Sequence, residues 1–140
     1  MKKSMMVTIA AFLLLQGCAT ESDLKKQGAV AMTGSEIKGT LIGNSLMGVS
    51  NGGYQVTWFL RNDGVIIGVN GSGAGRNARD SGVWEITQSG DFCTQWKKWG
   101  DGTKGCYKIY MVGDEVKTCG TASGNCSGSF KIVQGNPDKL

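Results

Sequence analysis

The sequence predicts an all-β domain, a small antiparallel meander that closes into a barrel or a strongly curled sheet, with one short helix at its N-terminal end. Short stretches of alternating apolar and polar residues recur at roughly ten-residue spacing, and tight turn signals separate them. The 140 residues include 23 glycines and one proline. Because the glycines are interleaved with aromatic and β-branched residues, they indicate turns between strands and not a disordered tract. A two-sheet β-sandwich is the alternative architecture.

The helix is predicted over residues 34–41. Thr33 and Glu36 have the spacing of a capping box, in which each side chain binds the backbone N–H of the other residue. Ile37 and Leu41 follow, four residues apart and therefore on one face. We expect this helix to cover or plug one end of the barrel.

The clearest strand is residues 54–60, where apolar residues occupy every second position. The other predicted strands are residues 45–50, 65–69, 81–87, 92–98, 106–112, 115–119 and 128–133. Glycine-containing turns join most neighbours, as in a meander. Closing such a meander on itself removes its unpaired edges.

The N-terminus has the pattern of a secretory signal over residues 1–17. Lys2 and Lys3 precede an apolar run, residues 5–15, that only Thr8 interrupts. A run of this length cannot span a hydrocarbon core of about 30 Å, which takes about 20 residues. The alternative is a buried N-terminal core helix.

The sequence Leu-Gln-Gly-Cys at residues 15–18 resembles the lipobox of bacterial lipoproteins. The resemblance implies cleavage before Cys18 and attachment of a diacylglyceryl group to its thiol through a thioether. Its acyl chains, such as palmitate, number at least two and hold the protein stably on a membrane. Ala19 stands where an aspartate favours the inner membrane, which points to the outer membrane, facing the periplasm or the surface. Residues 18–32 are then the lipidated N-terminus and a tether, and residues 33–140 are the β domain.

The predicted tether is polar and has no strand pattern. A helix over residues 21–27 is the alternative, although it shows no apolar stripe that could dock it.

Apart from Cys18, the chain has four cysteines, Cys93, Cys106, Cys119 and Cys126. An even number in a small exported domain indicates disulfide bonds. Of the three possible pairings, Cys93–Cys106 and Cys119–Cys126 are favoured because each pair brackets a glycine-containing reversal. The alternative, a zinc site, would have to use spacings of 13, 13 and 7 residues, without the short knuckle usual in zinc proteins.

Four short motifs look like a group of small exported bacterial proteins, lipocalin-like domains of unknown function. They are Gly-Val-Trp at residues 82–84, Cys-Thr-Gln-Trp at 93–96, Cys-Tyr at 106–107 and Gly-Asn-Pro at 135–137. The likeness spans residues 35–140. It supports the fold and implies no activity.

Composition removes several classes of function. The chain has no histidine, so the commonest general base and metal ligand are missing, and we expect no catalytic residues, cofactor or metal. Without Lys2 and Lys3, 13 basic residues stand against 11 acidic ones, and no five like charges are consecutive. We therefore expect no nucleic-acid partner.

Trp96, Lys97, Lys98 and Trp99 place two rings and two cations around one hairpin. Such rings could stack on a sugar or contact lipid headgroups. The alternative is that Trp96 packs inside and Trp99 shields the neighbouring disulfide.

Arg76 and Arg79 belong to a glycine-rich stretch, residues 70–79, and could meet an anionic ligand or a lipid headgroup. The stretch lacks the Gly-Lys-Ser/Thr of a phosphate-binding loop, so a plain hairpin loop is the alternative.

These observations predict a non-catalytic, membrane-anchored envelope lipoprotein that binds a ligand, a glycan or a partner protein of the envelope. A structural or inhibitor-type lipoprotein is the first alternative, and a histidine-free hydrolase the second. An open, lined cavity would favour a ligand, whereas a filled barrel with an exposed aromatic patch would favour a protein. About 105 domain residues predict the filled barrel.

Overall fold

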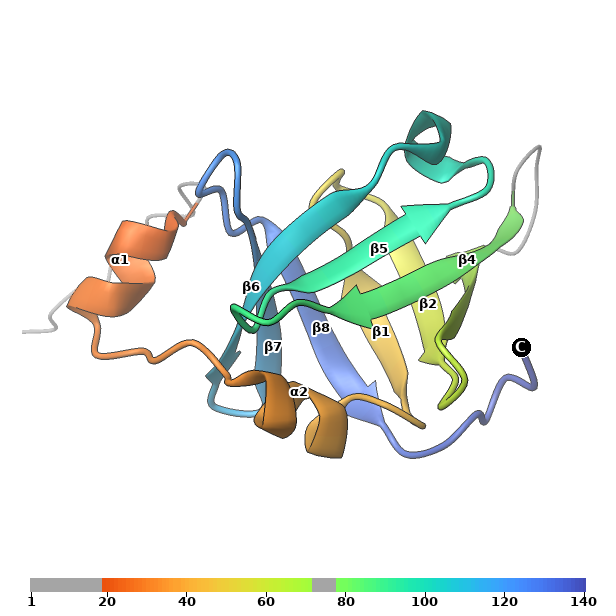
Figure 1. The fold of residues 1–140 in the computed structure, drawn as a ribbon, viewed down its shortest axis with the longest axis horizontal. Helices are drawn as coiled ribbons and strands as arrows, with labels where there is room; N and C mark the ends of the chain where they lie inside the picture. The colour runs from red at the N-terminus through yellow and green to blue at the C-terminus, as the bar shows by residue number, and fades with distance from the viewer. Residues whose placement is uncertain (1–18, 72–77) are drawn as a thin grey trace, which may run out of the picture.

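The structure, a computed structural model, describes residues 19–71 and 78–140, where eight strands form one closed antiparallel barrel (Figure 1). Each strand pairs with its neighbours in the chain, and the first also pairs with the last. The strands are β1 (Ser45–Val49), β2 (Gln55–Leu60), β3 (Val65–Asn70), β4 (Arg79–Ile86), β5 (Phe92–Trp96), β6 (Gly105–Val112), β7 (Glu115–Gly120) and β8 (Gly128–Val133). The predicted barrel is confirmed, and the sandwich is excluded. The predicted signal, Cys18 and Arg76 lie outside the described residues.

The predicted helix is α2 (Gly34–Thr40). Its capping box is present: the backbone N–H of Glu36 donates to the Thr33 hydroxyl at 3.2 Å, and the backbone N–H of Thr33 donates to the Glu36 carboxylate at 2.7 Å. Ile37 and Leu41 are fully buried in the barrel core. This helix therefore closes one end of the barrel, as expected.

The two barrel ends differ. The closed end carries α2 and the β2–β3, β4–β5 and β6–β7 connections, and the other end carries the β1–β2, β3–β4, β5–β6 and β7–β8 connections (Figure 1). Inward-facing side chains of the strands form the core between them. We call the end without α2 the open end, because the cavity described below opens there.

Residues 20–31 are not the undocked tether that the sequence predicted. They contain a helix, α1 (Glu21–Lys26), whose Leu24 is only 4% exposed and packs with Tyr110 and the two cysteines Cys119 and Cys126. Leu24 alone provides the apolar contact that docks this short helix on the disulfide. The lack of an apolar stripe therefore did not predict whether the helix would dock. Neither helix in the described part of the chain is long and apolar enough to cross a membrane.

Both predicted disulfides are present. Cys93–Cys106 joins directly opposite residues of β5 and β6, and Cys119–Cys126 links the end of β7 to the segment that enters β8. Each links neighbouring strands across the connection between them, at the hairpins that the sequence indicated.

Candidate functional site

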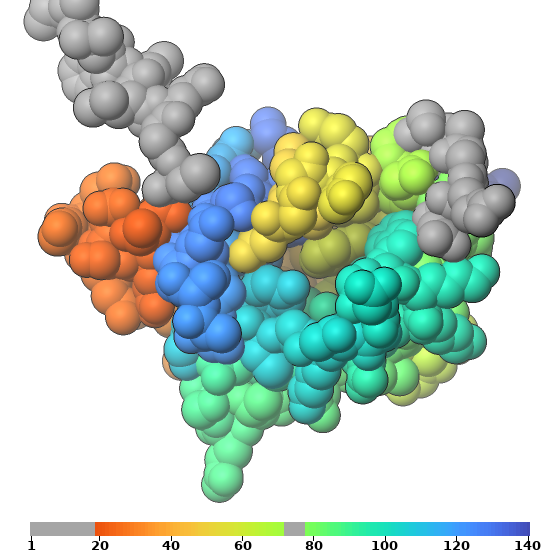
Figure 2. All heavy atoms as spheres, turned by 90° about the horizontal axis from the view of Figure 1, so that it is seen from above, coloured from red at the N-terminus to blue at the C-terminus, as the bar shows by residue number. Residues whose placement is uncertain are grey.

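A cavity of about 500 Å³ opens at the open end of the barrel. Figure 2 looks onto this end and shows a hollow beside the β1–β2 connection, drawn in yellow. The walls are the aromatic side chains of Trp58, Phe92, Trp96, Trp99 and Tyr107 with the aliphatic Leu46, Val56 and Ile109. The polar residues are Ser50, Asn51, Asn70 and Thr118, and Tyr54, Lys98, Gly52 and Gly100 complete the lining. The expected filled barrel is therefore wrong. The side chains and α2 fill only the closed end, and eight strands enclose more space than the remaining side chains occupy.

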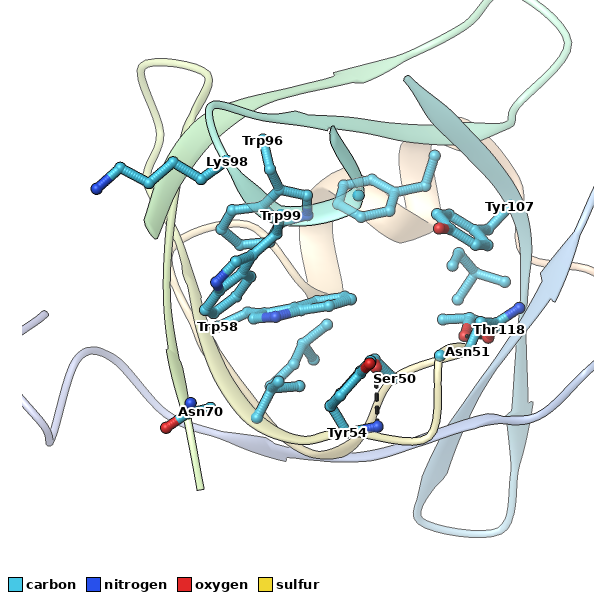
Figure 3. A pocket seen from close by; sticks show the side chains of 16 residues that line it. Ser50, Asn51, Tyr54, Trp58, Asn70, Trp96, Lys98, Trp99, Tyr107 and Thr118 are labelled. Carbon is cyan, nitrogen blue, oxygen red and sulfur yellow. Dashed lines mark hydrogen bonds between the residues drawn. The ribbon is translucent and has the colours of Figure 1, made fainter. Parts of the chain in front are cut away.

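Three tryptophans from different elements form one aromatic wall (Figure 3). The ring of Trp96 lies 5.5 Å from that of Trp58 and 4.7 Å from that of Trp99, measured between centroids, and both pairs are tilted. The buried Gly68 of β3 makes room for them, because a β-carbon there would lie 2.5 Å from the Trp99 ring and 2.8 Å from the Trp96 ring. The packing of the wall thus depends on the absence of a side chain at Gly68 of β3, the residue that pairs with Trp58 of β2.

The indole N–H of Trp58 is a buried donor with no hydrogen-bond partner among the described residues. The residue is 7% exposed, and its ring projects into the cavity (Figure 3). Leaving a buried donor unpaired costs about 1–3 kcal/mol. The nitrogen has almost no accessible surface, so a molecule in the cavity can offer it an acceptor only after a turn of the ring.

The hydroxyl of Tyr107 provides a second polar point, and it is directed into the cavity in Figure 3. Burial raises the pKa of this phenol above its usual value. It therefore stays protonated near neutral pH and can donate or accept a hydrogen bond.

Asp80 of β4 fixes the position of Trp99. It is 5% exposed, and one of its carboxylate oxygens accepts hydrogen bonds from the backbone N–H groups of Lys98 and Trp99, each at 2.8 Å. The other oxygen accepts from the backbone N–H of Ser81 at 2.8 Å. Burial acts to raise the pKa of Asp80, but these donors outweigh it, so the pKa lies below its usual value. The ionised carboxylate thereby holds the start of the short 3-10 turn η1 (Trp99–Gly102) over the mouth of the cavity.

The predicted cluster at the β5–β6 hairpin is divided by the fold. The ring of Trp96 is buried in the barrel, and Trp99 lies half-buried at the mouth. Lys97 and Lys98 are exposed, and the side chain of Lys98 points away from the cavity (Figure 3). Arg79 is exposed at the start of β4. The two rings belong to the cavity wall, Lys98 lines the rim with its side chain turned outward, and Lys97 and Arg79 are not part of the lining.

Sequence reasoning missed Trp58, Tyr107, Asn51 and Asp80 as site residues. The alternation in β2 does place Trp58 on the inward face, but only barrel closure brings it beside a ring from β5. Asn51 sits in a glycine turn, where its side chain accepts a hydrogen bond from Thr118 at the mouth. No local pattern marks Asp80, because its partners are backbone groups 18 and 19 residues away.

The lining of the described cavity is mostly aromatic and aliphatic. No carboxylate lines the described cavity, and no group of His, Cys, Asp and Glu side chains in residues 19–71 and 78–140 could hold a metal ion. Comparison with models of known protein families gives no match to this chain, and comparison with curated proteins gives none either.

Proposed function

We propose that the protein is a non-catalytic binding protein that holds a small, uncharged and largely apolar molecule in its barrel cavity. The observation that carries this proposal is the open, aromatic-lined cavity itself, whose wall includes Trp58 with an indole N–H that is unpaired among the described residues. Binding sites for small molecules are commonly mostly apolar, with a few polar groups that set the orientation of the ligand. Trp58 has that role here, and the hydroxyl of Tyr107 is a second polar group on the other side of the cavity.

The cavity chemistry defines the class of ligand. A volume of about 500 Å³ lies within the range of known small-molecule sites. Burying an ionised group without a partner is strongly unfavourable. Lys98, the one charged residue of the described lining, directs its side chain away from the cavity. A flat or branched apolar body with one carbonyl or ether oxygen fits these walls, because the oxygen can accept the hydrogen bond of Trp58.

A glycan is a less suitable ligand. Each sugar ring carries several hydroxyl groups, and a buried hydroxyl without a partner costs about 1–3 kcal/mol. The inner walls formed by Leu46, Val56, Phe92 and Ile109 are apolar and offer no side-chain partners. A sugar could meet polar groups only near the mouth, at residues such as Asn51 and Thr118.

We further propose that this binding protein is a lipoprotein of the bacterial envelope, attached to the outer membrane through Cys18. The signal pattern over residues 1–17 and the lipobox support this assignment. Two disulfides are also expected in an oxidising compartment and are rare in the cytoplasm.

Three fluorescent naphthalene probes test the ligand class. Prodan is neutral and carries a carbonyl, N-phenylnaphthylamine is neutral without a carbonyl, and anilinonaphthalene sulfonate carries a negative charge. We expect saturable binding of both neutral probes and much weaker binding of the sulfonate. Absence of saturable binding by the neutral probes, or preference for the sulfonate, would contradict the proposal.

The variant Trp58→Phe tests the hydrogen bond. Prodan affinity should fall about 2- to 12-fold, which corresponds to a hydrogen bond of about 0.5–1.5 kcal/mol. Binding of N-phenylnaphthylamine should change less, because it presents no carbonyl. Trp84→Phe is the matched control, since the Trp84 indole already donates to the backbone carbonyl of Arg61, away from the cavity.

A further inference from the structure

The beginning of the described chain, residues 19–21, is hydrogen-bonded to the β7–β8 connection. We call these residues the strap. The backbone N–H of Cys126 donates to the carbonyl of Ala19 at 2.9 Å, and the backbone N–H of Glu21 donates to the carbonyl of Gly124 at 2.9 Å. Between these two bonds, Thr20 forms a β-bridge with Asn125. Ala19 is therefore already fixed on the barrel.

The strap lies at the open end. The side-chain amide of Asn51, a residue of the cavity lining, donates to the carbonyl of Asn125 at 3.2 Å. The hydroxyl of Ser127 donates in turn to the backbone carbonyl of Asn51 at 2.9 Å. In Figure 2 the β7–β8 connection, in blue, lies between α1, in orange, and the β1–β2 connection, in yellow. Asn125 therefore connects the two: it pairs with Thr20 of the strap and accepts a hydrogen bond from Asn51 at the rim of the cavity.

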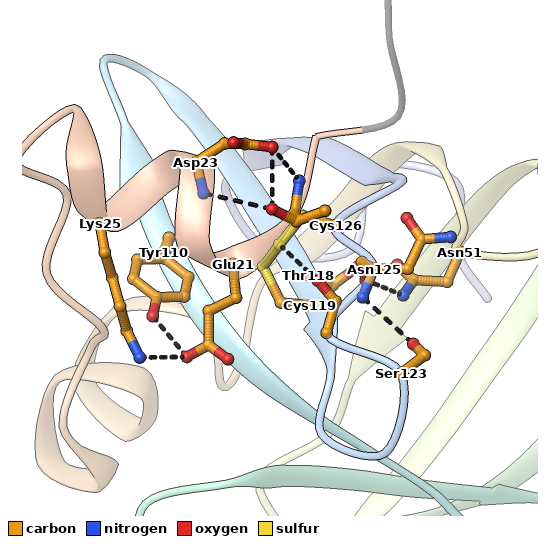
Figure 4. The surroundings of a disulfide bond; sticks show 12 residues. Glu21, Asp23, Lys25, Asn51, Tyr110, Thr118, Cys119, Ser123, Asn125 and Cys126 are labelled. Atoms are coloured by element: carbon orange, nitrogen blue, oxygen red, sulfur yellow. Dashed lines mark hydrogen bonds and ion pairs between the residues drawn. A yellow bond between two sulfur atoms is a disulfide. The ribbon is translucent and has the colours of Figure 1, made fainter.

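The strap is held by a buried cluster (Figure 4). Leu24 and the fully buried ring of Tyr110 pack with the Cys119–Cys126 disulfide. The Tyr110 hydroxyl donates to the carboxylate of Glu21 at 2.7 Å. Burial and this hydrogen bond raise the pKa of Tyr110 to about 12, so the phenol keeps its proton at any physiological pH.

Cys18 directly precedes Ala19, so their Cα atoms are about 3.8 Å apart. Almost no free chain therefore separates the proposed lipid anchor from the barrel. We propose that the anchor holds the open end of the barrel against the lipid bilayer, so that the cavity exchanges its ligand with the membrane. The inference rests on the proposed function, and it names the ligand as an uncharged molecule dissolved in the bilayer.

The rim also suits a bilayer surface. Tyr54 lines the mouth and is 70% exposed, which is unusual for a large ring and favourable at a membrane interface. Lys97 and Lys98 can lay their aliphatic stems along the interface and direct their amines to headgroups. Asp101 is also exposed on this side, but the two lysines together outweigh its single charge.

Photo-crosslinking tests the orientation. The full-length, lipidated protein is placed in vesicles of phosphatidylcholine with a minor share of phosphatidylglycerol. One variant carries Tyr54→p-benzoylphenylalanine at the rim, and the matched control carries Lys38→p-benzoylphenylalanine, which is exposed on α2 at the closed end. Mass spectrometry should show several-fold more phospholipid adduct for position 54 than for position 38.

A flexible Gly-Ser spacer inserted between Cys18 and Ala19 should abolish that difference, because it allows the barrel to turn. Equal adducts at the two positions without the spacer would overturn the inference, as would an intact mass showing no diacylglyceryl group on Cys18. Prodan titration of the detergent-solubilised protein separates the two proposals. If prodan binds but the labelling is equal, only the orientation is wrong. If prodan does not bind, the proposed function is wrong whatever the labelling shows.

Discussion

Replacing Gly68 by alanine tests whether the aromatic wall is packed as described. The new β-carbon would lie 2.5 Å from the Trp99 ring and 2.8 Å from the Trp96 ring, whereas carbon atoms in contact are about 3.5–4.0 Å apart. Both rings must therefore retreat, that of Trp99 by about 1 Å or more and that of Trp96 by about 0.7 Å or more. Trp96 is buried between two other tryptophans, so we expect Trp99 to be displaced toward solvent.

The sign of the stability change makes the test decisive. A glycine-to-alanine change at an unstrained position stabilises a protein by about 0.4–1 kcal/mol, because it restricts the unfolded chain. Overpacking at Gly68 should instead destabilise by about 1–3 kcal/mol. For a domain of this size, each kcal/mol corresponds to a fall in Tm of about 3–6 °C. Prodan affinity should fall as well, because Trp99 forms part of the cavity wall.

Urea and thermal unfolding followed by tryptophan fluorescence measure the first effect, and prodan titration measures the second. Gly39→Ala is the matched control: Gly39 is exposed on α2, and a β-carbon added there would meet no other described part of the chain within 4 Å. That variant should be as stable as the wild type or more stable, with unchanged binding. A Gly68→Ala protein that gains stability and binds prodan normally would refute the packing argument.

Three further variants test other parts of the site. Trp96→Ala should lower the free energy of unfolding by about 3–5 kcal/mol because the ring is buried, whereas Trp99→Ala should cost less stability and mainly weaken prodan binding; equal destabilisation in urea titrations would mean that both rings serve only as core. Asp80→Asn should destabilise at neutral pH. Because the folded-state pKa of Asp80 is lowered, its contribution is present above the usual aspartate pKa near 4 and is lost as the pH falls through the folded value. The difference in the free energy of unfolding between wild type and variant should therefore shrink below about pH 4 in urea titrations. A difference that stays constant with pH would show that the ionised carboxylate does not stabilise the fold through these hydrogen bonds. Tyr110→Phe removes the hydrogen bond to Glu21 and should speed amide hydrogen exchange in α1 while the barrel strands keep their protection; unchanged exchange in α1 would show that the bond does not hold the strap.

Local patterns in the sequence were enough to predict the strands, the capped helix and both disulfides. The alternation in β2 and the glycine turns depend on neighbouring residues, and so does the Thr33–Glu36 box. Closure of the barrel depends on the pairing of β1 with β8, which lie about 80 residues apart, and only the regular meander suggested it. The docking of α1 was missed because it depends on one leucine and on a tyrosine from β6.

The site was harder to predict than the fold, because each of its parts is assembled from distant segments. Trp96 and Trp99 stood out as neighbours in sequence, but their partners Trp58 and Gly68 come from β2 and β3. A count of residues could not show that space remains at one end, since the volume left over depends on where α2 and the rings pack. The hydrogen bonds of Asp80 leave no recognisable sequence motif, because its carboxylate accepts them from main-chain N–H groups, which nearly every residue carries.

The cavity sets a physical requirement on the rest of the fold. An unpaired indole N–H costs about 1–3 kcal/mol, which is a large fraction of the 5–15 kcal/mol that stabilises a typical domain. Further stabilising features lie outside the cavity: two disulfides connect neighbouring segments, α2 closes the far end, and α1 packs on the outside of the barrel. They can keep the barrel closed although no core side chains are packed across the open end. A ligand that pairs with Trp58 binds only the folded state and must therefore raise the stability further, in proportion to the logarithm of its concentration above Kd. The features outside the cavity can keep the barrel closed when no ligand is bound, which the proposed uptake and release of a ligand would require.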